Sequence, residues 1–117
     1  MRDEPLVYTS AAGQRDGTVI MKLAGPLTLT TMFALQTELR SIKPAVLILD
    51  LTETPYMDSA GLGLIMNYYV SAGNGARKLL LAGVNDRIMA LLDMTKVREI
   101  LQSFPTVAAA EEAEAAG

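Results

Sequence analysis

The residues with the clearest chemical potential lie in the segment 57–63, which reads Met-Asp-Ser-Ala-Gly-Leu-Gly. Asp58 and Ser59 are residue types that often begin helices, because their side-chain oxygens accept hydrogen bonds from free backbone N–H groups. The Ser59 hydroxyl would then lie at the positive end of the helix, where a phosphate group is well accommodated. The segment therefore indicates either a plain helix cap or a serine with a function.

Two glycines, Gly61 and Gly63, fall within the first turns of this expected helix. Each costs about 1 kcal/mol relative to alanine in a helix interior, so both positions need an explanation. One explanation is tight packing of the helix against a sheet. The other is the close approach of a second protein.

Catalytic interpretations of Ser59 find little support in the sequence. A nucleophile elbow needs glycine where Met57 stands, and Met66 occupies the place of the last glycine in a dinucleotide fingerprint. The chain has no histidine and no cysteine, which removes the commonest general base, thiol nucleophiles and Cys-ligated zinc. Lys78 and Lys96 are formal alternatives as a base, but nothing in the sequence brings them to the serine. We therefore expect no enzyme, no metal and no cofactor.

Apolar periodicity divides the chain into alternating strands and helices. The uninterrupted apolar runs 45–49 and 78–82 are typical of strands that are buried on both faces of a sheet. Thr28 and Thr30 offer hydroxyls that can cap the helix after them. The expected strands are 6–9, 18–23, 45–51, 78–82 and 104–107. The expected helices are 31–42, one from Asp58 to an end signal at 73–75, one that Asn85 caps, and an Ala/Glu-rich one from 108.

This element order predicts an α/β fold in a single domain. Strands that alternate with helices imply right-handed crossovers onto a parallel sheet. An Asp16-Gly17 turn joins the first two strands into a hairpin, so we expect a mixed, mostly parallel sheet of about five strands with crossover helices. The domain is expected to cover residues 1–107, and residues 108–117 to form a helix end or tail that frays.

Binding sites in such a sheet form at the carboxyl ends of the strands, in the loops that lead into helices. Three loops qualify, at 24–30, 52–61 and 83–86. The middle loop contains Asp58 and Ser59, so we expect the functional surface to lie there.

Four segments carry a resemblance to a known family. Asp50-Leu51 ends a buried strand, the motif 57–63 opens a helix, and the segments 81–84 and 91–95 read Leu-Ala-Gly-Val and Leu-Leu-Asp-Met-Thr. Over residues 6–107 the chain resembles the STAS domain family and, more narrowly, the bacterial anti-sigma factor antagonists. The fold of that family, a mixed sheet with helices, agrees with the element order.

The resemblance implies a phosphorylation switch. In the family, the serine that matches Ser59 is phosphorylated by a partner that is both an anti-sigma factor and a serine kinase. The unphosphorylated form binds this partner and thereby releases the sigma factor, and a metal-dependent serine phosphatase resets the switch. Thr28 departs from the family pattern, because an acidic residue often stands there, and the helix after the motif carries few charges.

We expect the partner to bind around Ser59. The expected contact residues are Thr28, Met57, Asp58, Ala60, Gly61, Leu62 and Met94. The methionines can equally be core filling. Tyr68 is either a surface anchor or packed on the sheet, and Arg87 either pairs with a phosphate or lies on a solvated helix face.

A second interpretation is a STAS domain that does not switch. Such a domain would serve as a scaffold subunit in a stress-signalling or transport complex, in a stable assembly with like or related chains. The switch requires modification of Ser59, whereas the scaffold does not.

Charge and hydropathy argue against nucleic-acid binding and against a membrane protein. The net charge of −3 at pH 7 argues against a direct nucleic-acid partner, which needs a clustered basic surface. No apolar run approaches the roughly 18–20 residues that cross a membrane, and residues 1–5 lead into no signal-peptide core. We therefore expect a cytoplasmic protein without a membrane partner.

Overall fold

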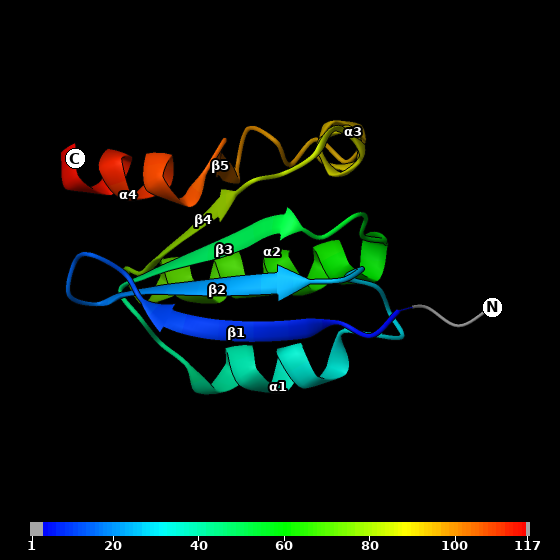
Figure 1. Ribbon diagram of the computed structural model, residues 1–117, viewed down its shortest axis with the longest axis horizontal. Helices are drawn as coiled ribbons and strands as arrows, with labels where there is room; N and C mark the ends of the chain where they lie inside the picture. Colours follow the sequence, from blue (N-terminus) through cyan, green and yellow to red (C-terminus); the bar gives the residue numbers. More distant parts are fainter. Residues whose placement is uncertain (1–3, 117) are drawn as a thin grey trace.

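Five strands form one mixed sheet in the computed structural model, which describes residues 4–116 (Figure 1). The strands are β1 (Val7–Ala12), β2 (Thr18–Ala24), β3 (Val46–Glu53), β4 (Lys78–Ala82) and β5 (Gln102–Phe104). β1 is antiparallel to β2, and all other neighbours are parallel, in the order β1-β2-β3-β4-β5. The predicted α/β fold with a mixed, mostly parallel sheet is confirmed.

Helices join the parallel strands. They are α1 (Phe33–Ser41), α2 (Ser59–Asn74), α3 (Asp86–Met94) and, after the last strand, α4 (Val107–Ala116). Residues 1–3 of the predicted domain and residue 117 of the predicted tail lie outside the described residues.

The central strands β3 and β4 are covered on both faces. Leu47 and Leu49 of β3 belong to the larger core, which includes buried residues of α1, α2 and α3. Ile48, between them, packs with Leu80 and with Ala110 of α4 on the opposite face. Figure 1 shows α2 running behind the sheet. Because neither face of these strands meets water, their sequences show no polar alternation, as predicted.

The last strand differs from its predicted position. The sequence predicts a strand over 104–107, whereas β5 spans Gln102–Phe104. Pro105 has no N–H to donate to a neighbouring strand, so the strand ends before it. Thr106 instead begins α4, because its hydroxyl oxygen accepts a hydrogen bond from Ala109 N at 3.0 Å.

The predicted cap of the first helix is wrong. α1 begins at Phe33, and Met32 precedes it without a side-chain hydrogen bond. The Thr28 and Thr30 hydroxyls instead lie 3.2 Å apart in the preceding loop. Thr28 N also donates to the Thr31 hydroxyl at 2.9 Å, so these threonines hold the loop together rather than cap the helix.

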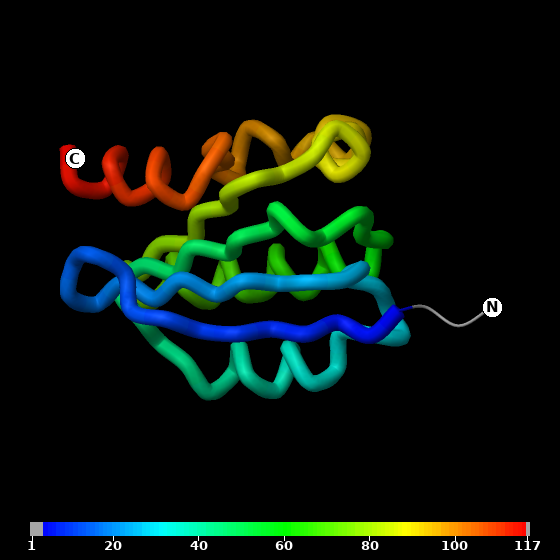
Figure 2. The backbone as a smooth tube through the Cα atoms, in the orientation of Figure 1, coloured from blue at the N-terminus to red at the C-terminus, as the bar shows by residue number. Residues whose placement is uncertain are grey.

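The predicted C-terminal helix is present, and in the described residues it continues to Ala116. Two of its carboxylates bind other elements. Glu111 accepts from Gln14 N at 2.7 Å, and Glu114 pairs with Lys78 at 3.3 Å. Figure 2 shows the turn between β1 and β2 beside the end of this helix. α4 is therefore joined both to the turn between β1 and β2 and to β4.

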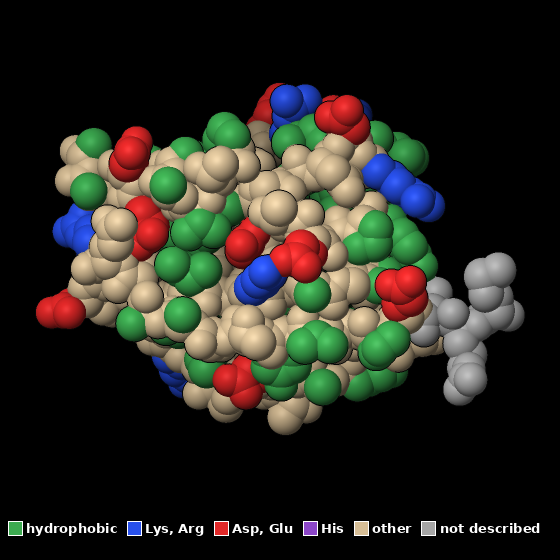
Figure 3. All heavy atoms as spheres, viewed as in Figure 1, with side chains coloured by type: hydrophobic (Ala, Val, Ile, Leu, Met, Phe, Trp, Pro, Cys, Tyr) green, Lys and Arg blue, Asp and Glu red, His purple; other side chains and the backbone are tan. Residues whose placement is uncertain are grey.

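The face of β1 and β2 that is turned away from the larger core is only partly covered: Ile20 packs against the α4 cluster, whereas Lys22 is exposed. Lys22 lies there beside Asp50 in the parallel register and pairs with Glu53, whose carboxylate raises the pKa of Lys22. Figure 3 views this face and shows charged side chains of both signs scattered among hydrophobic ones. The face in view therefore has no clustered basic patch.

Ala110→Glu should lower the free energy of unfolding by about 2–4 kcal/mol, because it forces a carboxylate among Ile48, Leu80 and Ala82. Urea unfolding followed by circular dichroism measures the change. Ala113→Glu is the matched control on the exposed side of α4 and should change stability by no more than about 0.5 kcal/mol. Equal effects of the two substitutions would contradict the packing of α4 on the sheet.

Candidate functional site

The loop after β2 and the loop after β3 run side by side at the carboxyl end of the sheet. Leu27 N donates to Tyr56 O at 3.1 Å, and Asp58 N donates to Leu27 O at 3.2 Å. Leu27 and Met57 thereby form a short parallel bridge outside the named strands. The first and second of the three predicted loops therefore form one backbone unit. Residues 57–61 form the Asp58 turn.

The Asp58 carboxylate joins this unit to α2. Its Oδ1 accepts from Gly61 N at 2.9 Å, which is the predicted helix cap. Its Oδ2 accepts from Leu29 N at 3.1 Å, in the loop after β2. One side chain therefore starts the helix and fixes the neighbouring loop against it.

Ser59 is the first residue of α2 and is exposed. Within residues 4–116 its hydroxyl makes no hydrogen bond, so it faces solvent rather than a general base. Lys78, one of the two lysines considered as a base, pairs with Glu114 of α4 instead. The geometry presents the hydroxyl to an external reagent.

The two glycines of the motif have different surroundings. A Cβ on Gly61 would lie 2.3 Å from the Leu27 backbone oxygen, so the fold needs glycine there for close packing. A Cβ on Gly63 would meet nothing within 4 Å. Gly63 follows Ser59 by four residues and therefore lies on the same side of α2. Packing explains the first glycine and leaves the second unexplained.

The third predicted loop is attached to the same unit. Asn85 caps α3, as predicted, because its Oδ1 accepts from Ile88 N at 2.8 Å. Its Nδ2 donates to Thr54 O at 3.3 Å and to Pro55 O at 3.0 Å. Asn85 therefore fixes the start of α3 against the loop that leads to Ser59.

Arg87, in the first turn of α3, lies over the ring of Tyr56 at 4.7 Å from the ring centroid. Tyr56 precedes Ser59 by three residues. This contact adds a cation to the loop that leads into the Asp58 turn.

The predicted contact residues divide by exposure. Thr28, Met57, Gly61 and Leu62 are buried, Asp58 and Ala60 are half-buried, and Met94 is exposed. The buried side chains hold the Asp58 turn rather than offer surface to a partner. Met94 is the last residue of α3, about 12 Å along that helix from the end that Asn85 fixes against the loop.

Sequence reasoning missed two exposed apolar residues in the segment that follows β2. Leu29 is 55% exposed and Phe33 is 58% exposed. Leu29 is bonded through its N–H to Asp58, and Phe33 is the first residue of α1. Phe33 lies off the apolar stripe formed by Leu35 and Leu39, and that departure from helical periodicity was the available signal for it, whereas Leu29 lies in the loop before α1 and carried no such signal.

Comparison with known proteins identifies the family. A family model described as STAS domain matches residues 10–110, so the chain belongs to the STAS domain family. The anti-sigma-B factor antagonist of Listeria monocytogenes serovar 1/2a is 39% identical over 57 residues, which are 49% of this chain and 50% of that protein. The match thus spans half the length of that curated relative.

Solved structures share the fold. An anti-sigma factor antagonist from Mycobacterium paratuberculosis superimposes with a TM-score of 0.78 at 19% identity, over 92% of this chain and 93% of that one. The Bacillus cell fate determinant SpoIIAA in its phosphorylated form gives 0.72 at 14%, over 91% and 97%. A sulfate transporter family protein from Wolinella succinogenes gives 0.73 at 26%, over 86% and 84%. The predicted resemblance and fold are confirmed.

Two further properties bear on the class of site. Of the helices that the structure describes, none has the length and apolar content needed to span a bilayer. Residues 4–116 also contain no cluster of three or more acidic side chains arranged to hold a metal ion.

Alanine at the two motif glycines should have opposite effects on stability. Gly61→Ala should lower the free energy of unfolding by about 1–3 kcal/mol, because the Leu27 backbone must move away. Gly63→Ala should raise it by up to about 1 kcal/mol, because it adds helix propensity in open space. Urea unfolding curves of both variants test this. A stabilised Gly61→Ala variant would contradict the packing assigned to that glycine.

Proposed function

We propose that this chain is an anti-sigma factor antagonist that is controlled by phosphorylation of Ser59. Unphosphorylated, it binds and sequesters an anti-sigma factor that is also a serine kinase. That kinase transfers the γ-phosphoryl group of ATP to Ser59 Oγ, the hydroxyl proton passes to a base of the kinase, and ADP leaves. A metal-dependent serine phosphatase hydrolyses the phosphoserine and restores binding.

The exposure of Ser59 at the first position of α2 carries the proposal. A kinase needs an accessible hydroxyl on a backbone of defined shape, and Asp58 fixes this backbone through Gly61 N and Leu29 N. The match to a curated anti-sigma-B factor antagonist and the likeness to phosphorylated SpoIIAA support the same role.

A phosphate on Ser59 is compatible with the fold. The first N–H groups of a helix have no acceptor inside the helix, and the helix dipole is positive at that end. Together they offset the repulsion between the phosphate and the neighbouring Asp58 carboxylate. We therefore expect phosphorylation to leave the fold in place, and the switch to act through charge.

The charge change falls on a helix that has no charged side chain of its own, next to the Asp58 carboxylate. α2 has no charged residue along its sixteen positions. A phosphoserine adds about −1.5 to −2 charges at pH 7, which takes the net charge from −3 to about −5. A partner surface that accepts a small hydroxyl must desolvate this dianion to bind, and the complex is therefore lost.

The contact surface proposed for the partner comprises Ser59, Gly63, Leu29 and Phe33. Leu29 and Phe33 provide exposed apolar anchors, and Gly63 lets a partner backbone approach the helix closely. Thr28, the position that departs from the family pattern, is buried in the loop below, so it acts on the partner through the position of Leu29.

A second candidate is a STAS subunit of a transport assembly that does not switch. The likeness to the Wolinella succinogenes sulfate transporter family protein favours it. This candidate has no need of a modifiable hydroxyl at Ser59, so the phosphorylation experiment separates the two.

Incubation with the cognate kinase and ATP should place one phosphate on Ser59, and mass spectrometry of the digested protein locates it. Ser59→Ala should remain unmodified while still binding the anti-sigma factor. Phosphate on the neighbouring threonines, such as Thr30, or no phosphate at all, would rule out Ser59 as the switch.

Ser59→Asp should weaken binding to the anti-sigma factor about 100-fold, equivalent to about 2.7 kcal/mol, and should leave the fold intact. The anti-sigma factor recovered with a Ser59→Ala bait is titrated by calorimetry. Ser71→Asp is the control, because it puts the same charge on an exposed serine about 18 Å further along α2. Undiminished binding by Ser59→Asp would contradict the charge mechanism.

Gly63→Gln should weaken the same complex at least about tenfold, because a long side chain blocks the approach of the partner. Gly73→Gln is the matched control, since a Cβ there also meets nothing within 4 Å and the site lies about 21 Å from Ser59 along the helix. Equal binding by both variants would exclude Gly63 from the interface.

A further inference from the structure

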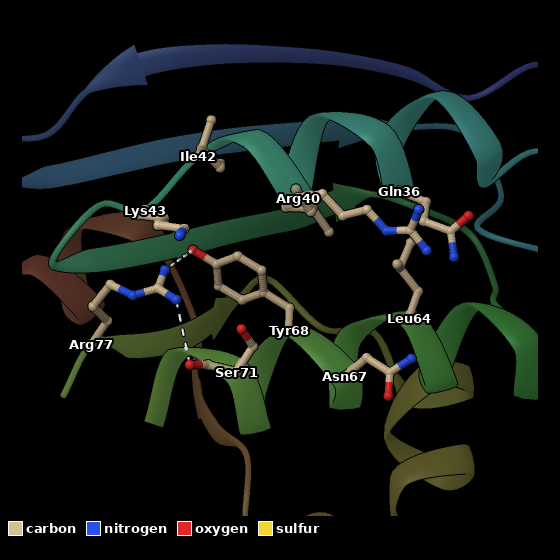
Figure 4. A pocket seen from close by; sticks show the side chains of 10 residues that line it. Gln36, Arg40, Ile42, Lys43, Leu64, Asn67, Tyr68, Ser71 and Arg77 are labelled. Atoms are coloured by element: carbon tan, nitrogen blue, oxygen red, sulfur yellow. Dashed lines mark hydrogen bonds between the residues drawn. The ribbon is translucent and has the colours of Figure 1, made fainter. Parts of the chain in front are cut away.

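A groove between α1 and α2 is basic although the chain as a whole is acidic. The groove has a volume of about 300 Å³ and is lined by Arg40, Lys43 and Arg77, with no acidic residue of the described chain in its wall. Figure 4 shows Lys43 and Arg77 on one side of the Tyr68 ring and Arg40 on the other. Three cations therefore surround one small space.

These cations have no carboxylate partners among residues 4–116. The ion pairs of that part of the chain are Lys22–Glu53, Lys78–Glu114 and Arg98–Asp93. The chain has more acidic than basic residues, with a net charge of −3, yet no acidic residue lines the groove. The positive charge there is left for a ligand to neutralise.

Tyr68 contributes a part-buried hydroxyl to the groove. The residue is 7% exposed, and its hydroxyl oxygen accepts a long hydrogen bond of 3.5 Å from Arg77 Nη1. The Arg77 guanidinium lies 5.8 Å from the ring centroid, and its Nη2 donates to Ser71 O at 3.4 Å. Burial raises the pKa of Tyr68, so its O–H remains a donor at neutral pH.

The rest of the lining combines amide groups with an apolar wall. Gln36 and Asn67 add neutral hydrogen-bonding groups, and Leu39, Ile42 and Leu64 form the wall. A volume of about 300 Å³ is at the lower end of the range for small-molecule sites. Arginine and lysine suit phosphate oxygens, and the apolar wall suits an organic group.

We propose that this groove binds a small molecule that carries a phosphate group, held by Arg40, Lys43, Arg77 and the Tyr68 hydroxyl. Tyr68 lies about 13 Å along α2 from Ser59, towards the opposite end of the sheet. The site is therefore separate from the Asp58 turn and does not depend on the function proposed for it.

Helix dipoles offer a competing account of the same cations. Arg40 lies in the last turn of α1, and Arg77 binds a carbonyl near the end of α2, where positive charge stabilises the helix. That role requires no ligand. Binding of a phosphate probe, rather than stability, separates the two accounts.

The test is a titration of the full chain followed by backbone amide NMR at constant ionic strength. Inorganic phosphate and phenyl phosphate should both give saturable shifts in residues 39–43 and 67–77, with phenyl phosphate binding more tightly. Phenol, which lacks the phosphate, should give none. Absence of saturable shifts at millimolar phosphate and phenyl phosphate, or shifts centred on the Asp58 turn, would overturn the proposal.

Variants assign the binding to the groove. Arg40→Gln and Arg77→Gln should each weaken phenyl phosphate at least about tenfold, and Tyr68→Phe about threefold, because each removes a donor to the anion. Lys96→Gln, which removes an exposed cation outside the groove, should have no effect. If Arg77→Gln fails to fold, the exposed Arg40 and the ring-preserving Tyr68→Phe decide the question. Equal weakening by Lys96→Gln would show that phenyl phosphate is held only by non-specific charge attraction, and would contradict a binding site in the groove.

Discussion

The Asp58 carboxylate is the interaction on which the site depends. Its two oxygens bind Gly61 N of α2 and Leu29 N of the loop after β2, which lie far apart in the sequence. Without this side chain the helix would lose its cap and Leu29 N its acceptor, and only the backbone hydrogen bonds of Leu27 would hold the loop beside Ser59. The carboxylate therefore acts as a structural clamp, and the hydroxyl next to it remains available for chemistry supplied by another protein.

The two glycines separate the needs of the fold from those of the proposed partner. Gly61 is required because the Leu27 backbone lies against it, whereas the fold places nothing against Gly63. In the proposed function, this costly residue in open space, on the same side as the exposed serine, serves the approach of the partner. Because α2 itself carries no charged side chain, a phosphate on Ser59 would be the first charge on the helix and would add to that of the neighbouring Asp58 carboxylate.

The order of strands and helices along the chain, the Asp58 and Asn85 caps and the location of the motif could be predicted because they follow from local patterns. The uninterrupted apolar runs predicted β3 and β4. The side-chain oxygens of Asp58 and Asn85 predicted where α2 and α3 begin. The contacts between loops could not be predicted, since Thr28 reads as a helix cap until its burial beside other hydroxyls is known. The exposure of the motif residues could not be predicted either. Met57 and Leu62 were expected to contact a partner, but both are buried in the core cluster that contains Leu27.

The central claim is that phosphorylation changes the charge of a turn whose backbone stays fixed. Amide hydrogen exchange at Leu29 and Gly61, the two N–H groups that Asp58 binds, tests it most directly when measured before and after phosphorylation of Ser59. The account predicts that both amides keep their protection while the anti-sigma factor no longer binds. Loss of protection at either amide in the phosphorylated chain would show that the turn opens, and would contradict a switch that acts through charge alone.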